Sequence, residues 1–178
     1  MDGPTAIAFA HSCREAAPLF LEEPVWPPED FATLAEVRIK GGLNVAAGEN
    51  ACTAHQFSQM MKAGAVSHAQ PSVTKVGGIT EYLKVVTLAD EMGVRLAPHS
   101  PYFGPGLLAT LQLLSLRDDA TFVEVFYMKC RVGPHRHRTA SLIEWTHQDS
   151  LVARRAKKCL LDEFYNCFRV VPRRSFGA

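Results

Sequence analysis

The sequence predicts an α/β protein: a partial (β/α) barrel of the TIM type with about five βα units, followed by an unrelated basic, helical C-terminal tail. Short apolar runs alternate with amphipathic stretches over residues 1–129, as expected for strands and helices of a parallel sheet. From residue 130 this alternation stops and the balance of charge changes sign. We therefore predict a partial barrel domain at 1–129 and a basic tail at 130–178, whose fold stays open.

The ends of the predicted strands are evenly spaced. The strand-end residues, separated by 27, 23, 27 and 25 positions, are Glu22, Glu49, Ser72, His99 and Glu124. This separation matches the length of one βα unit. A doubly wound open sheet would share the alternation, but it would not require a polar residue at every strand end. Functional side chains of a barrel gather at these carboxyl ends, so the pattern favours a barrel.

Each element has its own local signal. The predicted strands are the apolar runs 19–22, 43–49, 66–70, 94–97 and 122–126. Helices are indicated by apolar side chains at helical spacing, by Thr53 as a cap and by glycines at their ends. The predicted helices are 5–16, 27–41, 53–64, 79–92 and 107–116. A tight loop with a Gly-Gly pair, 70–78, connects the third strand to the fourth helix.

The C-terminal tail differs in charge. Residues 130–178 hold ten Lys/Arg and four Asp/Glu, whereas residues 1–129 hold nine Lys/Arg and fourteen Asp/Glu. One amphipathic helix is expected at about 148–170. No aromatic-interleaved or zinc-finger pattern accompanies the basic residues, so we interpret them as a solvated helix face and do not predict nucleic acid as a partner.

The composition argues against several classes of protein. No apolar run approaches the roughly 18 residues that cross a bilayer, and the N-terminus lacks a signal-peptide pattern, so we predict no membrane partner and a cytoplasmic location. The five cysteines have no CxxC spacing, which argues against a zinc site and a disulfide framework. We expect reduced thiols that mostly pack.

The strand-end residues suggest a chemistry. Glu22 and Glu49 end neighbouring strands, where two carboxylates can meet one hard cation such as Mg²⁺, which prefers oxygen ligands and keeps several waters. A metal there can take up charge that builds on a substrate oxygen when a carbon acid loses a proton. His99 can move that proton, because its unperturbed pKa lies near neutrality. The alternative is that these acids only cap helices or form salt bridges.

Four motifs occur in a fixed order: Leu-Glu-Glu-Pro at 21–24, Gly-Glu-Asn at 48–50, Gln-Pro-Ser-Val-Thr-Lys-Val-Gly-Gly-Ile-Thr-Glu at 70–81 and Ala-Pro-His-Ser at 97–100. In order and spacing they resemble the enolase superfamily, and within it the mandelate racemase/muconate lactonising enzyme group, which includes the sugar-acid dehydratases. The similarity covers about residues 6–127, the C-terminal barrel portion. It implies a modified TIM barrel that abstracts the α-proton of a carboxylate and stabilises the enediolate on Mg²⁺.

The resemblance assigns roles by position. It implies Glu22 and Glu49 as metal ligands, His99 as general base and Glu124 as an acid that hydrogen-bonds the substrate carboxylate. Ser72 stands where mandelate racemase-like members place the Asp that orients and charges the histidine. A serine hydroxyl can hydrogen-bond an imidazole, but it cannot stabilise an imidazolium as a carboxylate does. We therefore expect His99 to be a weaker base, or an acid on a leaving group.

Other family features have no counterpart in the sequence: the third ligand, an Asp one strand before Glu22, the Lys-x-Lys strand and the capping domain. The function thus stays open between two predictions. One is part of a Mg²⁺-dependent lyase or isomerase acting on a sugar acid. The other is a catalytically inactive remnant with a structural or interaction role, self-associating through open barrel edges and exposing interior residues such as Phe20 and Ala46.

Overall fold

The computed structural model describes residues 1–101, 105–117 and 123–124. They belong to two units, one from Met1 to Ala97 and one that begins at Pro98. The predicted tail, 130–178, lies outside the described residues. Among the residues described, no helix is both long and apolar enough to cross a bilayer.

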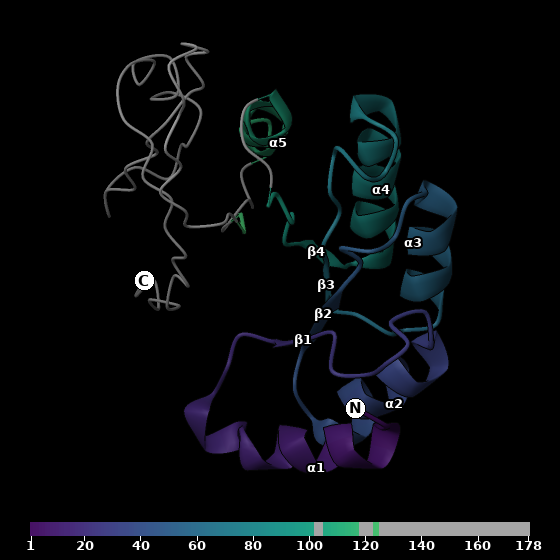
Figure 1. Ribbon diagram of the computed structural model, residues 1–178, viewed down its shortest axis with the longest axis vertical. Coiled ribbons are helices and arrows are strands. Elements are labelled where there is room, and N and C mark those ends of the chain that lie inside the picture. Colours follow the sequence, from purple (N-terminus) through teal and green to yellow (C-terminus); the bar gives the residue numbers. More distant parts are fainter. Residues whose placement is uncertain (102–104, 118–122, 125–178) are drawn as a thin grey trace, which may run out of the picture. The chain divides into compact units, whose positions relative to one another are not determined.

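The first unit contains a parallel sheet with strand order β1-β2-β3-β4, as the alternating pattern predicts (Figure 1). The strands are β1 (Leu21–Glu22), β2 (Val45–Ala47), β3 (His68–Ala69) and β4 (Arg95–Leu96). Their register pairs Glu22 with Ala46, Ala46 with His68 and His68 with Arg95. These four residues therefore share one face of the sheet. Each strand is shorter than its apolar run, because only part of each run pairs with a neighbouring strand.

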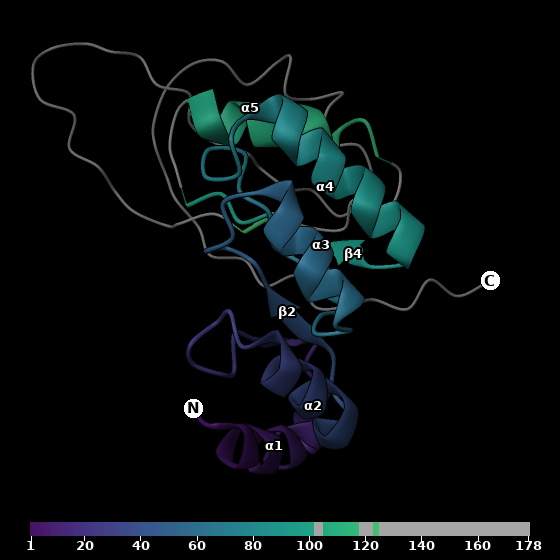
Figure 2. The same cartoon turned by 90° about the vertical axis from the view of Figure 1, so that its right-hand side faces the viewer.

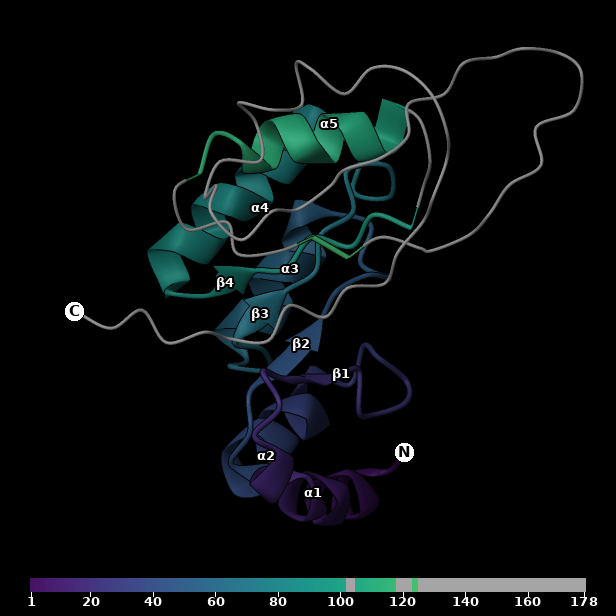
Figure 3. The same cartoon turned by 90° about the vertical axis from the view of Figure 1, so that its left-hand side faces the viewer.

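In the first unit, α2, α3 and α4 connect successive strands and lie on one side of the sheet. Figures 2 and 3 show α2, α3 and α4 following one another along that side. The helices are α1 (Gly3–Ser12), α2 (Phe31–Gly41), α3 (Ala54–Lys62), α4 (Ile79–Met92) and, in the second unit, α5 (Pro105–Leu114). A short 3₁₀ helix, η1 (Arg14–Ala16), follows α1. This arrangement is the one expected of successive βα units.

Two predicted helix boundaries are wrong. The helix expected to open at Pro27 begins at Phe31, because Asp30 caps it: Asp30 Oδ1 accepts the backbone N–H of Thr33 at 3.0 Å. The helix expected over 5–16 ends at Ser12, and the chain leaves η1 at Ala17 in the left-handed conformation (φ 45°). In contrast, Thr53 caps α3 as predicted.

Two arginines link successive helical segments of the first unit. Arg14 donates from Nε and Nη2 to the Gly41 carbonyl at the end of α2, at 3.2 and 3.0 Å. Arg38, on α2, donates from Nε to the Gly64 carbonyl after α3, at 2.7 Å. Carbonyls near a helix C-terminus carry partial negative charge and favour such cations. These contacts fix successive helices and therefore the strand ends that they connect.

The predicted exposure of barrel-interior residues is not found in the middle of the sheet. Ala46 is fully buried, so the expectation that it would be exposed is wrong. Phe20 is half-buried, with its ring centroid 5.2 Å from that of His68. His68 itself is buried. The middle of this face, at Ala46 and His68, is therefore buried, whereas Glu22 and Arg95 at its two ends are exposed.

Candidate active site

The loop 70–78 is a compact turn that leads from β3 to α4. The Ser72 carbonyl accepts the backbone N–H groups of Lys75 and Val76 at 3.0 and 2.9 Å. Gly77 and Gly78 then adopt positive φ angles of 102° and 93°, which favour glycine. The predicted Gly-Gly entry into the fourth helix is confirmed, since α4 begins at the next residue.

Ser72 lies buried at the start of this turn. Its hydroxyl is 3.1 Å from Thr74 Oγ1, within the same loop. The hydroxyl thus has a local partner. The hydrogen bond from Ser72 to His99 stays a prediction.

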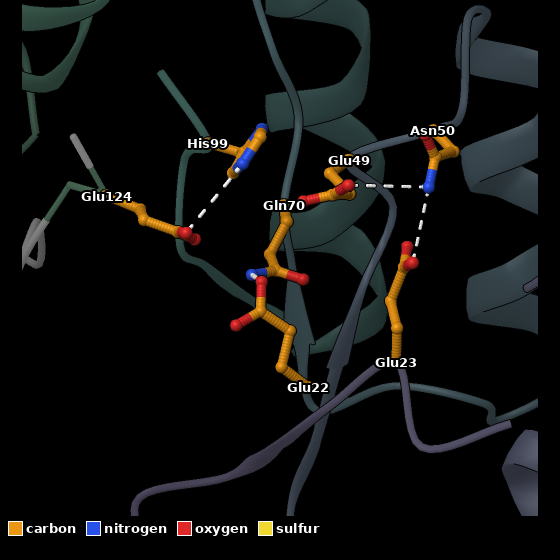
Figure 4. Close-up of polar contacts among 7 residues, drawn as sticks. All are labelled: Glu22, Glu23, Glu49, Asn50, Gln70, His99 and Glu124. Atoms are coloured by element: carbon orange, nitrogen blue, oxygen red, sulfur yellow. Dashed lines mark hydrogen bonds and ion pairs between the residues drawn. The ribbon is translucent and has the colours of Figure 1, made fainter. Parts of the chain in front are cut away.

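Glu22 is held by an amide from the other side of β2. Gln70 Nε2 donates to Glu22 Oε1 at 2.7 Å, and the Gln70 side chain is buried while Glu22 is exposed (Figure 4). The two residues are 48 positions apart in sequence. Glu22 therefore lies at the carboxyl end of β1, as predicted, with one oxygen engaged by a neutral donor.

Glu49 belongs to a second polar group that includes a residue the sequence analysis missed. Asn50 Nδ2 donates to Glu23 Oε2 at 3.2 Å and lies 3.5 Å from Glu49 Oε1 (Figure 4). The backbone N–H of Glu23 bonds the Ala46 carbonyl at 3.0 Å, and its φ is 35°. The Glu-Glu pair in the sequence could have indicated the separate place of Glu23. Successive side chains at a strand end point in different directions, so only one of the two acids can face the strand-end site.

The surroundings of Glu23 disfavour the charged form of its carboxyl group. Burial, and then the nearby Glu49 carboxylate, raise its pKa above the usual value for a glutamate. The more distant Glu22 acts in the same direction, and hydrogen bonds from the Gly48 backbone and Asn50 oppose it. Its Oε1 atom is buried and has no hydrogen-bond partner among the described residues, and the residue lines a small cavity beside Gln56 and Met60 of α3. The strand ends therefore hold excess negative charge.

This donor set fits a hard cation only in part. Two carboxylates, Glu22 and Glu49, lie at the carboxyl ends of neighbouring strands, and Mg²⁺ is commonly held by one or two carboxylates together with waters. No group of three or more His, Cys, Asp or Glu residues among the described residues is arranged to hold a metal. Asp2, the one aspartate before Glu22 in the sequence, caps α1 by accepting the Thr5 N–H at 2.9 Å. The chemistry fits a site with two protein ligands.

His99 and Glu124 form a pair within the second unit. A parallel bridge joins them: the Ser100 N–H bonds the Glu124 carbonyl and the Glu124 N–H bonds the Pro98 carbonyl, both at 2.9 Å. The two side chains also lie close together, with His99 Nε2 3.7 Å from Glu124 Oε1 (Figure 4). The rest of the predicted strand 122–126, apart from 123 and 124, lies outside the described residues. A direct pairing of this acid with the histidine was not predicted.

The structure thus forms local groups: Glu22 with Gln70, Glu49 with Asn50 and Glu23, Ser72 with Thr74, and His99 with Glu124. The convergence of the five predicted site residues on one substrate stays a prediction.

Comparison with known proteins gives consistent relatives. The family model described as enolase C-terminal domain-like matches residues 1–149, so the match continues past residue 129. D-galactonate dehydratase from Ralstonia pickettii (strain 12J) is 32% identical over 145 residues, covering 82% of this chain and 36% of that protein. D-galactonate dehydratase from Cronobacter sakazakii is 31% identical over 128 residues, 72% of this chain and 32% of that protein. The chain spans about a third of the length of these curated relatives.

Solved structures agree. A mandelate racemase/muconate lactonizing enzyme-like protein from Rubrobacter xylanophilus is 32% identical with a TM-score of 0.65, over 69% of this chain and 31% of that one. L-talarate dehydratase from Polaromonas sp. JS666, complexed with Mg and L-glucarate, is 29% identical with a TM-score of 0.54, over 56% of this chain and 26% of that one. The chain belongs to the enolase superfamily, as a C-terminal domain-like member related to the sugar-acid dehydratases of the mandelate racemase/muconate lactonising enzyme group.

Proposed function

We propose that this chain provides the Mg²⁺-binding strand ends of an enolase-type barrel that abstracts the α-proton of a hydroxy-carboxylate. The observation that carries the proposal is the placement of Glu22 and Glu49 at the carboxyl ends of neighbouring parallel strands, each beside a side-chain amide. When bound, the metal would stabilise negative charge on a substrate oxygen. Glu22 and Glu49 would hold it, and waters would complete its coordination.

The remaining site residues suit proton transfer. His99 is buried, and a buried imidazole can accept or return a proton without competition from bulk water. Glu124, 3.7 Å from it, can orient the ring or contact the substrate carboxylate. Ser72 contributes a hydroxyl but no charge, which favours a slower base than a histidine paired with an aspartate.

We infer that the substrate is a sugar acid. D-galactonate dehydratase relatives and a neighbour complexed with Mg and L-glucarate support this class. Dehydration and racemisation share the first step, loss of the α-proton. Exchange of that proton in D₂O, followed by ¹H NMR of D-galactonate and L-glucarate, tests either outcome. A His99→Asn variant should lose the exchange, and equal exchange with and without His99 would refute its role.

Titration calorimetry with Mg²⁺ tests the metal site itself. We expect weak binding by the wild-type chain and its loss in Glu49→Gln, since the variant removes one of two charged ligands. Glu36→Gln is the matched control, because Glu36 is an exposed acid on α2 that pairs only with Lys40 in the described part. Equal heats for the wild type and Glu49→Gln would exclude the site.

A structural or interaction role is the second candidate. It is favoured by Ser72 in place of a charged partner, and by β1, which pairs with one strand only among the described residues. An unpaired strand edge can add a strand from another chain. We propose self-association through such edges, in the cytoplasm. Analytical ultracentrifugation would contradict it by showing a monomer at all concentrations.

A further inference from the structure

Gln70 is a fully polar side chain in a buried position. Gln70 follows β3 directly. Only 1% of its surface is accessible to solvent, although glutamine is mostly found at protein surfaces. A buried amide is tolerated only when its polar atoms have partners. Its donor goes to Glu22 Oε1 at 2.7 Å, a short hydrogen bond to a carboxylate.

The register of the sheet explains how Gln70 reaches Glu22. Glu22 pairs with Ala46 and Ala46 pairs with His68, so these three side chains share a face. Gln70 is two residues after His68 and lies on the same face. β1 and β3 flank β2, about 10 Å apart at the usual strand spacing. The contact is diagonal, because His68 and not Gln70 is level with Glu22. Ala46, the β2 residue level with Glu22, carries only a methyl group, which leaves room for two long side chains to meet across β2.

The backbone of Gln70 is also held in place. Its backbone N–H donates to the Ala47 carbonyl at the end of β2, at 3.0 Å, and its side chain is enclosed. Glu22, in contrast, is exposed and would otherwise sample several rotamers. A rigid donor therefore restrains a mobile carboxylate. Because the donor is a neutral amide, it adds no positive charge that would repel a cation, as a lysine would.

We propose that Gln70 is a positioning residue that holds the Glu22 carboxylate in place for a cation across the intervening strand β2. The inference rests on the metal site proposed above. The amide occupies Oε1, and Oε2 of Glu22 makes no hydrogen bond within the described part of the chain. Removing an outer partner of a ligand usually lowers metal affinity by about 10–100-fold. Gln70 belongs to this class, which is distinct from a core amide that only completes packing.

Mn²⁺ binding, followed by electron paramagnetic resonance of the free ion, separates the two roles, because Mn²⁺ accepts the same oxygen ligands as Mg²⁺. The full chain is compared as wild type, Gln70→Met, Glu22→Gln and the double variant. Gln70→Met retains length and apolar volume but removes the donor. Gln70→Asn, which keeps an amide too short to reach Glu22, serves if Gln70→Met does not fold. Gln59→Met, at an exposed site on α3, is the matched control.

We expect Gln70→Met to weaken Mn²⁺ binding by about 10-fold or more, and to change it less than about twofold when Glu22→Gln is already present. Gln59→Met should bind as the wild type does. A change below twofold in folded Gln70→Met, or an equal loss in both backgrounds, would overturn the positioning role alone. A wild-type chain that binds no Mn²⁺ would overturn the metal site and the role of Gln70 together.

Discussion

Acidification should destabilise the first unit through His68, which is buried in β3. Only 2% of its surface is exposed, and its ring packs against Phe20. The Ser67 hydroxyl donates to the Val45 carbonyl at 3.1 Å, so the contact of 3.0 Å between Ser67 Oγ and His68 Nδ1 is best made by a proton on Nδ1. Burial, and then the charge of Arg95, lower the pKa of His68 from 6.5 to about 4.

The sign and size of the effect follow from linkage. The folded state binds a proton on His68 less readily than the unfolded state, whose pKa stays near 6.5. The stabilisation is therefore fully present above pH 6.5 and is lost as the pH falls towards 4. The free energy of unfolding should decrease by about 2 kcal/mol between pH 7.5 and pH 5 from this residue. The limit below pH 4 is about 3 kcal/mol.

Urea unfolding at pH 7.5, 6.5 and 5, for the wild type and His68→Asn, isolates this contribution from that of the carboxyl groups. Asparagine can place an amide donor near the position of Nδ1 and does not titrate. We expect the wild type to lose about 2 kcal/mol more than His68→Asn over this range. Arg95→Gln should reduce the pH dependence, because Arg95 is the smaller cause of the lowered pKa of His68. Parallel pH profiles for the wild type and His68→Asn would refute the reasoning.

Substitutions at Asp30, Gly48 and Arg38, with Asp30→Asn and Gly93→Ala as comparisons, test the scaffold by urea unfolding at pH 7. Asp30→Ala should lose about 1 kcal/mol, since it removes the cap of α2, whereas Asp30→Asn should retain most of it. Gly48→Ala should lose about 2 kcal/mol, because φ is 119° and a Cβ would lie 2.6 Å from an α3 ring. Gly93→Ala, with φ of 65° and open space, should lose less. Arg38→Met should lose about 1.5 kcal/mol with its charged hydrogen bond.

The order of elements was predictable because each βα unit repeats the same local patterns, and all four strands of the first unit form where apolar runs were found. The length of each strand was not predictable from the sequence, because a ladder forms only where residues of one strand lie opposite residues of the next. The start of α2 was misplaced for a different reason. Prolines and acids favour a first helical turn, but the Asp30 side chain bonds to Thr33 and makes Asp30 the cap.

The site could be predicted as positions but not as contacts. Glu22 ends β1, and Glu49 follows β2 by two residues, as the spacing indicated. The partners of these acids depend on register: Gln70 reaches Glu22 diagonally across β2 because His68, two residues before Gln70, is level with Ala46 and Glu22. Likewise, the pairing of His99 with Glu124 depends on a bridge between segments 25 residues apart. Periodicity along one chain segment carries no information on such alignment.

The Glu-Glu-Pro motif shows how one strand end can separate two identical side chains. Glu22, the last residue of β1, keeps the strand alternation and shares the face of Ala46 and His68. Glu23 has a φ of 35°, a conformation that few non-glycine residues adopt, and turns its carboxylate to Asn50 and the cavity beside α3. The first acid therefore remains exposed for a ligand, while burial and the charge of Glu49 raise the pKa of the second. The backbone turn at Glu23, more than the side-chain chemistry, decides which of the two glutamates stays exposed.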